Sequence, residues 1–194
     1  MKSDIILAGV GGQGIISIAA AIGNAALSKD LYMKQAEVHG MSQRGGSVQS
    51  TLRISSKPIA SDLIPYGGAD MILAIEPMES LRYLPYLKKE GWLVTNSVPF
   101  LNIAEYPDLN GIIEEIKKVK QHVVIDADAI AAEVATKRAS NMVMLGAASI
   151  FVDLPVDSIQ DGIRQIFGSK GDRIINMNID AMMAGRDAAQ VFVK

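Results

Sequence analysis

The chain has 194 residues, 49% of them hydrophobic and 21% charged, which is enough for a substantial buried core and excludes disorder. Its net charge of −2 gives no general attraction to nucleic acid or to an anionic membrane. The absence of cysteine excludes disulfides, thiolate zinc sites and iron–sulfur clusters held by this chain. No apolar run suits a signal peptide or a membrane-spanning helix, so we expect a soluble, cytoplasmic protein.

The first half of the chain alternates expected strands with expected helices. A strand over 4–9 runs into a glycine-rich turn, and a helix over 15–28 and a strand over 31–38 follow. A polar loop punctuated by glycine spans 40–46. Apolar and polar residues then alternate along Ser47–Ser55, which favours a half-buried strand and is compatible with an antiparallel edge of a sheet.

The second half continues this alternation and ends in helices. We expect a strand over 71–75, a helix from Pro77 to about Leu87, a strand over 92–95, a helix over 109–119, a strand over 122–125 and helices over 127–136, 142–151, 157–167 and 173–193. Asp157 is expected to cap the helix that it begins. The pattern predicts a single three-layer α/β/α domain over 1–194, with a Rossmann-like, mostly parallel sheet.

A glycine-rich turn stands between the first strand and the first helix. Glycine lets the backbone approach a ligand closely, and the N-terminus of a helix offers unpaired N–H groups to an anion. The candidate binding residues are Gly9, Gly11, Gly12, Gln13 and Gly14. Close packing is the alternative reason for these glycines. If the ligand were a dinucleotide, Glu37 would stand where an acidic residue holds the ribose.

The segment over 37–47 places an acid, an imidazole, a hydroxyl, an amide and a guanidinium beside glycines at the end of a predicted strand. Ligands bind beyond the carboxyl ends of strands in open α/β sheets, so this loop should adjoin the first one. Arg44 could pair with a carboxylate or phosphate, and His39 could exchange a proton near neutral pH. The candidates are His39, Ser42, Gln43, Arg44 and Gly45. A loop-stabilising or intersubunit contact is the alternative.

Three further acidic residues follow predicted strands. Glu76 could face the same crevice or stabilise the N-terminus of the next helix. Asp126 and Asp128 resemble a metal-binding pair, but no histidine or further acid is grouped closely around them. Capping of the helix over 127–136 is therefore the favoured role for both.

Three segments together resemble a known family, the gamma-type subunits and domains of 2-oxoacid:ferredoxin oxidoreductases. They are the runs Gly9-Val10-Gly11-Gly12-Gln13-Gly14 and Glu37-Val38-His39-Gly40-Met41-Ser42-Gln43-Arg44-Gly45-Gly46, and the Glu-Pro-x-Glu-x-x-Arg-Tyr stretch over 76–83. The run over 176–178 and the final helix are similar as well, so the resemblance spans nearly the whole chain. It is especially clear for members whose complexes act on indolepyruvate and related aryl pyruvates.

The resemblance implies a complex that oxidatively decarboxylates a 2-oxoacid to an acyl-CoA and passes the electrons to ferredoxin. In this family thiamine diphosphate and 4Fe–4S clusters sit on a partner alpha subunit, so this chain would bind no cofactor or metal alone. It would be inactive without its partner and act in a hetero-oligomer. Coenzyme A would bind at the glycine loop, while His39 and Arg44 would be the catalytic candidates.

Other functions stay open from the residues. Related gamma subunits serve complexes that act on pyruvate, ketoisovalerate or 2-oxoglutarate. A Rossmann-type oxidoreductase that binds NAD through the glycine loop and Glu37 is a second alternative. A third is an assembly subunit without a catalytic role, whose loops only support the partner.

Overall fold

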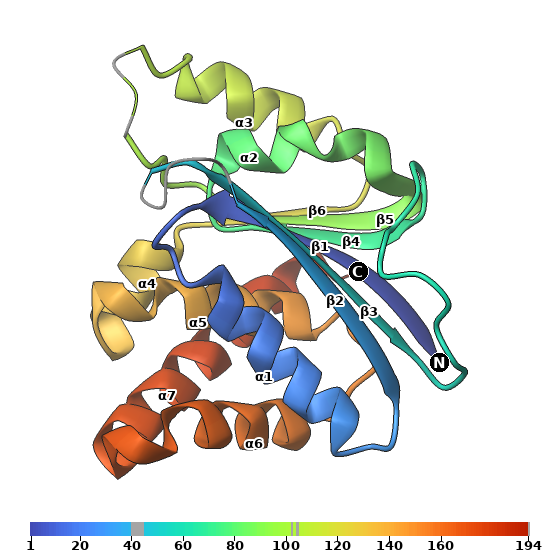
Figure 1. The fold of residues 1–194 in the computed structure, drawn as a ribbon. Coiled ribbons are helices and arrows are strands. Elements are labelled where there is room, and N and C mark those ends of the chain that lie inside the picture. Colours follow the sequence, from blue (N-terminus) through green and yellow to red (C-terminus); the bar gives the residue numbers. More distant parts are fainter. Residues whose placement is uncertain (40–44, 102, 104, 194) are drawn as a thin grey trace.

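The architecture is a six-stranded sheet with helices on both faces, as seen in a computed structural model (Figure 1). The structure describes residues 1–39, 45–101, 103 and 105–193. Of His39 it describes the backbone alone. The strand order is β2-β3-β1-β4-β5-β6. The strands are β1 (Lys2–Val10), β2 (Tyr32–His39), β3 (Ser47–Ser55), β4 (Ala69–Ala74), β5 (Leu87–Asn96) and β6 (His122–Ile125). The expected three-layer α/β/α fold is confirmed.

Strands β1, β4, β5 and β6 pair in parallel, whereas β3 pairs antiparallel with both β1 and β2. The antiparallel edge is therefore confirmed, although β2 is the outermost strand and β3 lies one position inside it. Among the described strands β3 alone runs opposite to the others. The carboxyl ends of β1, β2, β4, β5 and β6 consequently meet the start of β3 along one side of the sheet, which we call the carboxyl edge.

The two faces of the sheet are covered unequally (Figure 1). One face carries α1 (Ile15–Leu27), α4 (Ala127–Val134), α5 (Ser140–Ser149), α6 (Val156–Phe167) and α7 (Asp172–Ala189); the other carries α2 (Pro77–Arg82) and α3 (Leu109–Lys117). Successive side chains of β1 point to opposite faces of the sheet, so this strand contributes to both cores. Ile5 and Leu7 belong to the core under α1, and Ile6 and Ala8 belong to the core under α2 and α3. No helix within the described ranges is long and apolar enough to cross a membrane.

Two local expectations are wrong. The helix expected from Pro77 to about Leu87 ends at Arg82, because Pro85 cannot donate the hydrogen bond that would continue it. The chain passes through a 3-10 turn into β5, which begins at Leu87. Asp157 does not cap α6, which begins at Val156 behind Pro155 and has no side-chain cap. Asp157 lies in its first turn instead.

The remaining expected elements are present with shifted ends. Three further 3-10 turns lie next to helices, at Lys137–Ala139, Gly168–Lys170 and Gln190–Phe192. The last of these replaces the final turn of the helix expected over 173–193, since α7 ends at Ala189.

Candidate functional site

The two loops predicted to form a site lie side by side at the carboxyl edge. The N–H group of Gly11 donates to the carbonyl oxygen of Gly46 at 2.8 Å, and the N–H group of Gly45 approaches the carbonyl oxygen of Gly11 at 3.5 Å. Their proximity follows from the sheet, because Val10 at the end of β1 is opposite Ser47 at the start of β3. The first loop and the described end of the second are therefore in contact at the carboxyl edge, where Val10, Gly45 and Ser47 line one cavity. We call this contact and the cavities that open around it the crevice.

The glycines of the first loop serve different purposes. Gly14 has a φ of +84°, and a Cβ there would collide with the side-chain amide of Asn141 on α5. A Cβ at Gly9 would lie 2.9 Å from Oε1 of Gln13. Close packing thus accounts for both residues. Gly12, with a φ of +100°, has open space where its side chain would be, so it is needed for backbone conformation and faces outward.

Gln13 closes this turn on itself. Its Oε1 accepts a hydrogen bond from the N–H group of Val10 at 2.7 Å. Its own N–H group donates to the carbonyl oxygen of Val10 at 3.1 Å. The side-chain oxygen of Gln13 is therefore engaged within the loop, although the residue also lines a cavity beside it.

Two cavities open on either side of Gly12. The smaller, of about 320 Å³, is lined by Val10, Gly11, Gly12, Gly14, Ile15, Ile16, Ser17, Glu37 and Val48. The larger, of about 520 Å³, is lined by Gly12, Gln13, Ile75, Asn96, Val98, Pro99, Phe100, Asp128, Arg138 and Ser140. Helix α1 begins between them with neither a side-chain cap nor an acidic residue in its first turn. This arrangement leaves the positive end of α1 directed at the crevice.

The wall of the larger cavity contains a polar pair that links the end of β5 to the first turn of α4. Asn96 is buried at the end of β5; its Oδ1 accepts from the N–H group of Ala127 at 3.0 Å, and its Nδ2 donates to Oδ2 of Asp128 at 2.9 Å. Asp126 caps α4 through the N–H group of Ala129, as expected. The capping role expected for Asp128 is wrong, because its carboxylate contacts Asn96.

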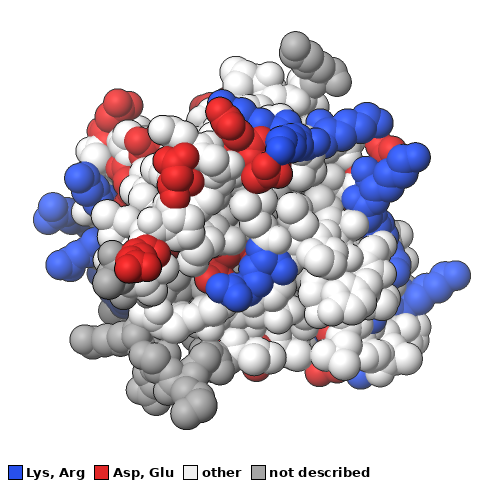
Figure 2. Space-filling model, turned by 90° about the horizontal axis from the view of Figure 1, so that it is seen from above, with Lys and Arg blue, Asp and Glu red and all other residues white. Residues whose placement is uncertain are grey.

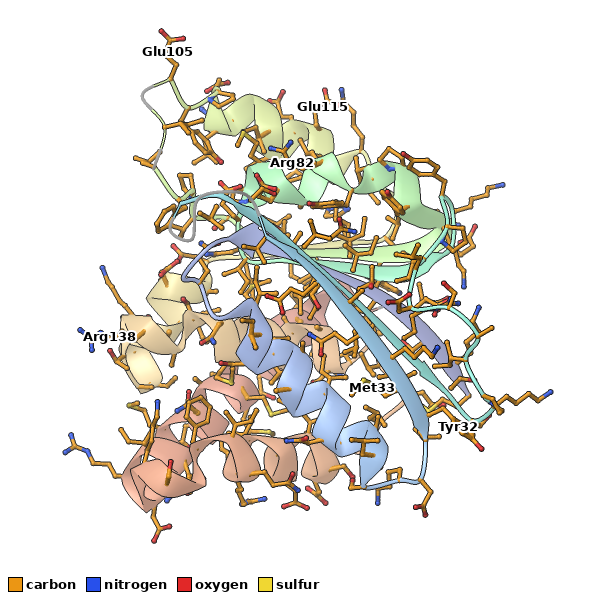
Figure 3. The ribbon with its side chains drawn as sticks, in the orientation of Figure 1. Tyr32, Met33, Arg82, Glu105, Glu115 and Arg138 are labelled. Carbon is orange, nitrogen blue, oxygen red and sulfur yellow. The ribbon has the colours of Figure 1, made fainter. Side chains whose placement is uncertain are left out.

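Sequence reasoning missed Asn96 and Arg138. Asn96 stands at the carboxyl end of a predicted strand, so the logic that singled out Glu76 applies to it as well. Arg138 lies on the short 3-10 turn between α4 and α5, and no local pattern marked it. It is exposed at the rim of the larger cavity, on the opposite face of the sheet from Arg82 (Figure 3).

Glu76 combines the two roles considered for it. It is the N-cap of α2, and its Oε2 accepts from the N–H group of Glu79 at 2.8 Å. Its Oε1 accepts a hydrogen bond from the hydroxyl of Tyr106, and burial together with this bond raises the pKa of Tyr106 above its ordinary range. It also lines a third cavity of about 230 Å³ at the carboxyl edge, with Ser47, Glu79 and Arg82.

The position of Glu37 does not reproduce a dinucleotide site. In such sites the acidic residue ends the strand next to the one that precedes the glycine turn. Here the antiparallel strand β3 separates β2 from β1. Glu37 lines the smaller cavity from this more distant strand.

The charged surface near the site is mixed. On the face that carries α2 and α3, acidic and basic side chains are interspersed with uncharged surface (Figure 2). Within the described ranges no group of three or more acidic or histidine side chains is placed to hold a metal ion. Ser42, Gln43, Arg44 and the side chain of His39 lie outside the described residues, so their roles stay predictions.

Comparisons with known proteins decide the family. Residues 4–188 match the family model of pyruvate ferredoxin/flavodoxin oxidoreductase. The chain belongs to this family. It is 35% identical to the indolepyruvate oxidoreductase subunit IorB of Archaeoglobus fulgidus, over 97% of this chain and 96% of that one. Identity to the subunit of the same name in Methanothermobacter thermautotrophicus is 36%, over 97% and 98% of the two chains.

A solved structure of lower sequence identity shares the fold of this chain. The 2-oxoglutarate:ferredoxin oxidoreductase of Magnetococcus marinus, with 2-oxoglutarate, coenzyme A and succinyl-CoA bound, superimposes with a TM-score of 0.77 at 22% sequence identity. The match covers 98% of this chain but 31% of that longer one. The family resemblance predicted from the three sequence segments is confirmed, and the chain is one subunit of an oxidoreductase that acts on 2-oxoacids.

Proposed function

We propose that the chain is the smaller subunit of an enzyme that decarboxylates indolepyruvate and related aryl 2-oxoacids to acyl-CoA and reduces ferredoxin. The substrate rests on the names of the relatives at 35% and 36% identity. The observation that carries the site is the hydrogen bond between Gly11 and Gly46, which joins the two loops beside the uncapped start of α1. The whole chain, 1–194, forms its single gamma-type domain.

The cofactors of this reaction belong to the partner alpha subunit. The chain has no cysteine for 4Fe–4S clusters, and thiamine diphosphate supplies the electron sink for decarboxylation when it is bound to the partner. Large apolar side chains of Ile16, Val38 and Leu101 are exposed around the carboxyl edge. Exposed apolar surface next to a site favours coverage by another protein, which supports a hetero-oligomer closed at this edge.

Coenzyme A is the ligand proposed for the glycine loop. Gly12 leaves open space between two cavities, and the start of α1 has no side-chain cap, so the loop fits an anionic group. Gly12 and the N–H groups of α1 would hold a phosphate of coenzyme A. The other candidates, Gly9, Gly11, Gln13, Gly14 and Gly45, would shape the turn around it.

The second loop would complete the site toward the partner. Arg44 would pair with the carboxylate of the 2-oxoacid or a phosphate of coenzyme A, with Ser42 and Gln43 beside it. His39 would hold or release a proton near neutral pH. Both residues would act together with the partner, so the assembled complex is the form in which to test them.

The decisive experiment substitutes Arg44→Ala and His39→Ala in the complex with its partner. Loss of a hydrogen bond to a charged group corresponds to roughly a tenfold or greater fall in kcat/KM for the oxoacid or coenzyme A. An assay of ferredoxin reduction measures this fall in kcat/KM. Arg164→Ala is the control, because Arg164 pairs with Asp161 on the exposed side of α6. Unchanged constants in an intact complex would instead support an assembly subunit, and binding of NADH would support the dinucleotide alternative.

A further inference from the structure

The described end of the second loop is held from two sides. The carbonyl oxygen of Gly46 accepts from Gly11, which fixes the loop to the glycine turn. On the other side the hydroxyl of Ser47 donates to Oε2 of Glu79 on α2 at 2.6 Å. Three elements that are distant in the sequence therefore converge where the loop enters β3.

Glu79 is itself held rigidly. Its side chain is 4% exposed, and Arg82 reaches it with two contacts, Nε to Oε2 at 2.9 Å and Nη2 to Oε1 at 3.1 Å. This hydrogen-bonded pair raises the pKa of Arg82. Arg82 lies on α2 (Figure 3), and its side chain is about half exposed. The carboxylate is thus oriented independently of its contact with Ser47.

The start of α2 also holds a second segment near the carboxyl edge. Glu76 bonds the N–H group of Glu79 and the hydroxyl of Tyr106, which lies between β5 and α3. Ser47, Glu76 and Glu79 line one cavity together with Val10 and Phe100. Two buried carboxylates at the start of α2 consequently hold two segments, the start of β3 and the stretch between β5 and α3.

We infer that Glu79 is a positioning residue for the two-loop site, acting through the hydroxyl of Ser47. It sets the position of Gly46 and Ser47, the described end of the second loop, relative to Gly11. Displacement of a reacting group by about 1 Å can lower a rate by about a hundredfold. A small shift of this loop would therefore reduce turnover far more than it reduces stability. The inference rests on the proposed function, since it assumes that the second loop acts in catalysis.

The experiment compares Ser47→Ala, Ser47→Thr and Glu79→Gln in the complex with the partner. We expect kcat/KM to fall by about tenfold or more in Ser47→Ala and Glu79→Gln, and to return to within about twofold of the original in Ser47→Thr, which restores the hydroxyl and suits a strand. Both KM and kcat are measured, together with thermal unfolding. Ser55→Ala, at the other end of β3, and Glu115→Gln, in an exposed ion pair on α3, are the matched controls.

The outcomes separate this inference from the proposed function. If Arg44→Ala impairs turnover but Ser47→Ala and Glu79→Gln do not, the positioning role is wrong and the proposed function stands. If none of the three changes turnover, the catalytic part of the proposed function fails as well. A loss in Ser47→Ala that follows dissociation of the complex, or that Ser47→Thr does not restore, would also overturn the positioning role.

Discussion

At the scale of single residues, a buried ion pair joins the two central antiparallel strands. Asp4 on β1 is 2% exposed, and Arg53 on β3 reaches it with Nε at 2.7 Å and Nη2 at 3.1 Å. Nη1 of Arg53 donates to the carbonyl oxygens of Ser61 and Leu63. Burial alone would raise the pKa of Asp4, but hydrogen bonds from Arg53 and Lys2 outweigh it and hold the pKa below its usual value.

This depressed pKa predicts a pH-dependent contribution to stability. The paired carboxylate stabilises the fold above the ordinary aspartate pKa of about 3.9, and this contribution is lost as pH falls through the lower folded-state pKa. We expect Asp4→Asn to lower the free energy of unfolding by about 2 kcal/mol or more at neutral pH, because Arg53 is left in a largely buried place without its counter-charge. Unfolding in urea, monitored through the fluorescence of Trp92, measures this change in the free energy of unfolding.

Acidification supplies the control for this prediction. The difference in the free energy of unfolding between Asp4→Asn and the unchanged chain should begin to shrink below about pH 4, where the Asp4 carboxylate of the unfolded chain begins to take up a proton. Asp161→Asn, in an exposed pair with Arg164, should change the free energy of unfolding by less than about 1 kcal/mol. An equally large effect of Asp4→Asn at neutral and strongly acidic pH would contradict the assignment.

At the scale of elements, α5 and α7 pack with their backbones in contact. A Cβ at Gly146 on α5 would overlap the carbonyl oxygen of Met182, and a Cβ at Gly185 on α7 would overlap that of Val143. The absence of a side chain at each glycine thus lets the backbone of the other helix approach closely. The close approach matters for the site because α5 also carries Asn141, whose Nδ2 donates to the carbonyl oxygen of Gly14 at 3.4 Å.

Gly146→Ala tests this contact against helix propensity. Alanine normally stabilises the interior of a helix by about 1 kcal/mol relative to glycine. Here we expect a net destabilisation of about 1–3 kcal/mol, because overlap with Met182 forces the helices apart. Gly168→Ala is the control, since a Cβ at that 3-10 position meets nothing within 4 Å. A stabilised Gly146→Ala variant in thermal unfolding would contradict the close packing.

At the scale of the whole molecule, the crevice and its three cavities all lie at the carboxyl edge. Because the proposed function places the cofactors on the partner, we expect the isolated chain to support no oxoacid-dependent reduction of ferredoxin, and the reconstituted complex to support it. Indolepyruvate should give a kcat/KM at least about tenfold above those of pyruvate and 2-oxoglutarate, since burial of its indole ring in the complex would add apolar binding energy that the smaller substrates lack. Turnover by the isolated chain, or a preference for pyruvate, would contradict this assignment.

Local signals in the sequence were sufficient for the fold class and for the two loops. The alternation along Ser47–Ser55, the glycine-rich turn before α1 and the helical periodicity behind it each lie within a few neighbouring residues. Such patterns report which residues are buried and where the chain must turn, so they predict elements and strand ends. They also placed Glu76 at a helix start and Asp126 at a cap. The family resemblance, carried by the same loops, added the activity.

The meeting of the two loops could be predicted from their strand ends, but tertiary structure alone decided the other contacts between these parts. The sequence contained no sign that β3 would stand between β2 and β1, which separates Glu37 from the place of a ribose-binding acid. Ser47 meets Glu79 and Asn96 meets Asp128 across 32 residues in each case, and Arg53 meets Asp4 across 49. Strand order and helix placement create these pairs. Periodicity describes how one segment is buried, but the free energy of packing all segments together selects their neighbours.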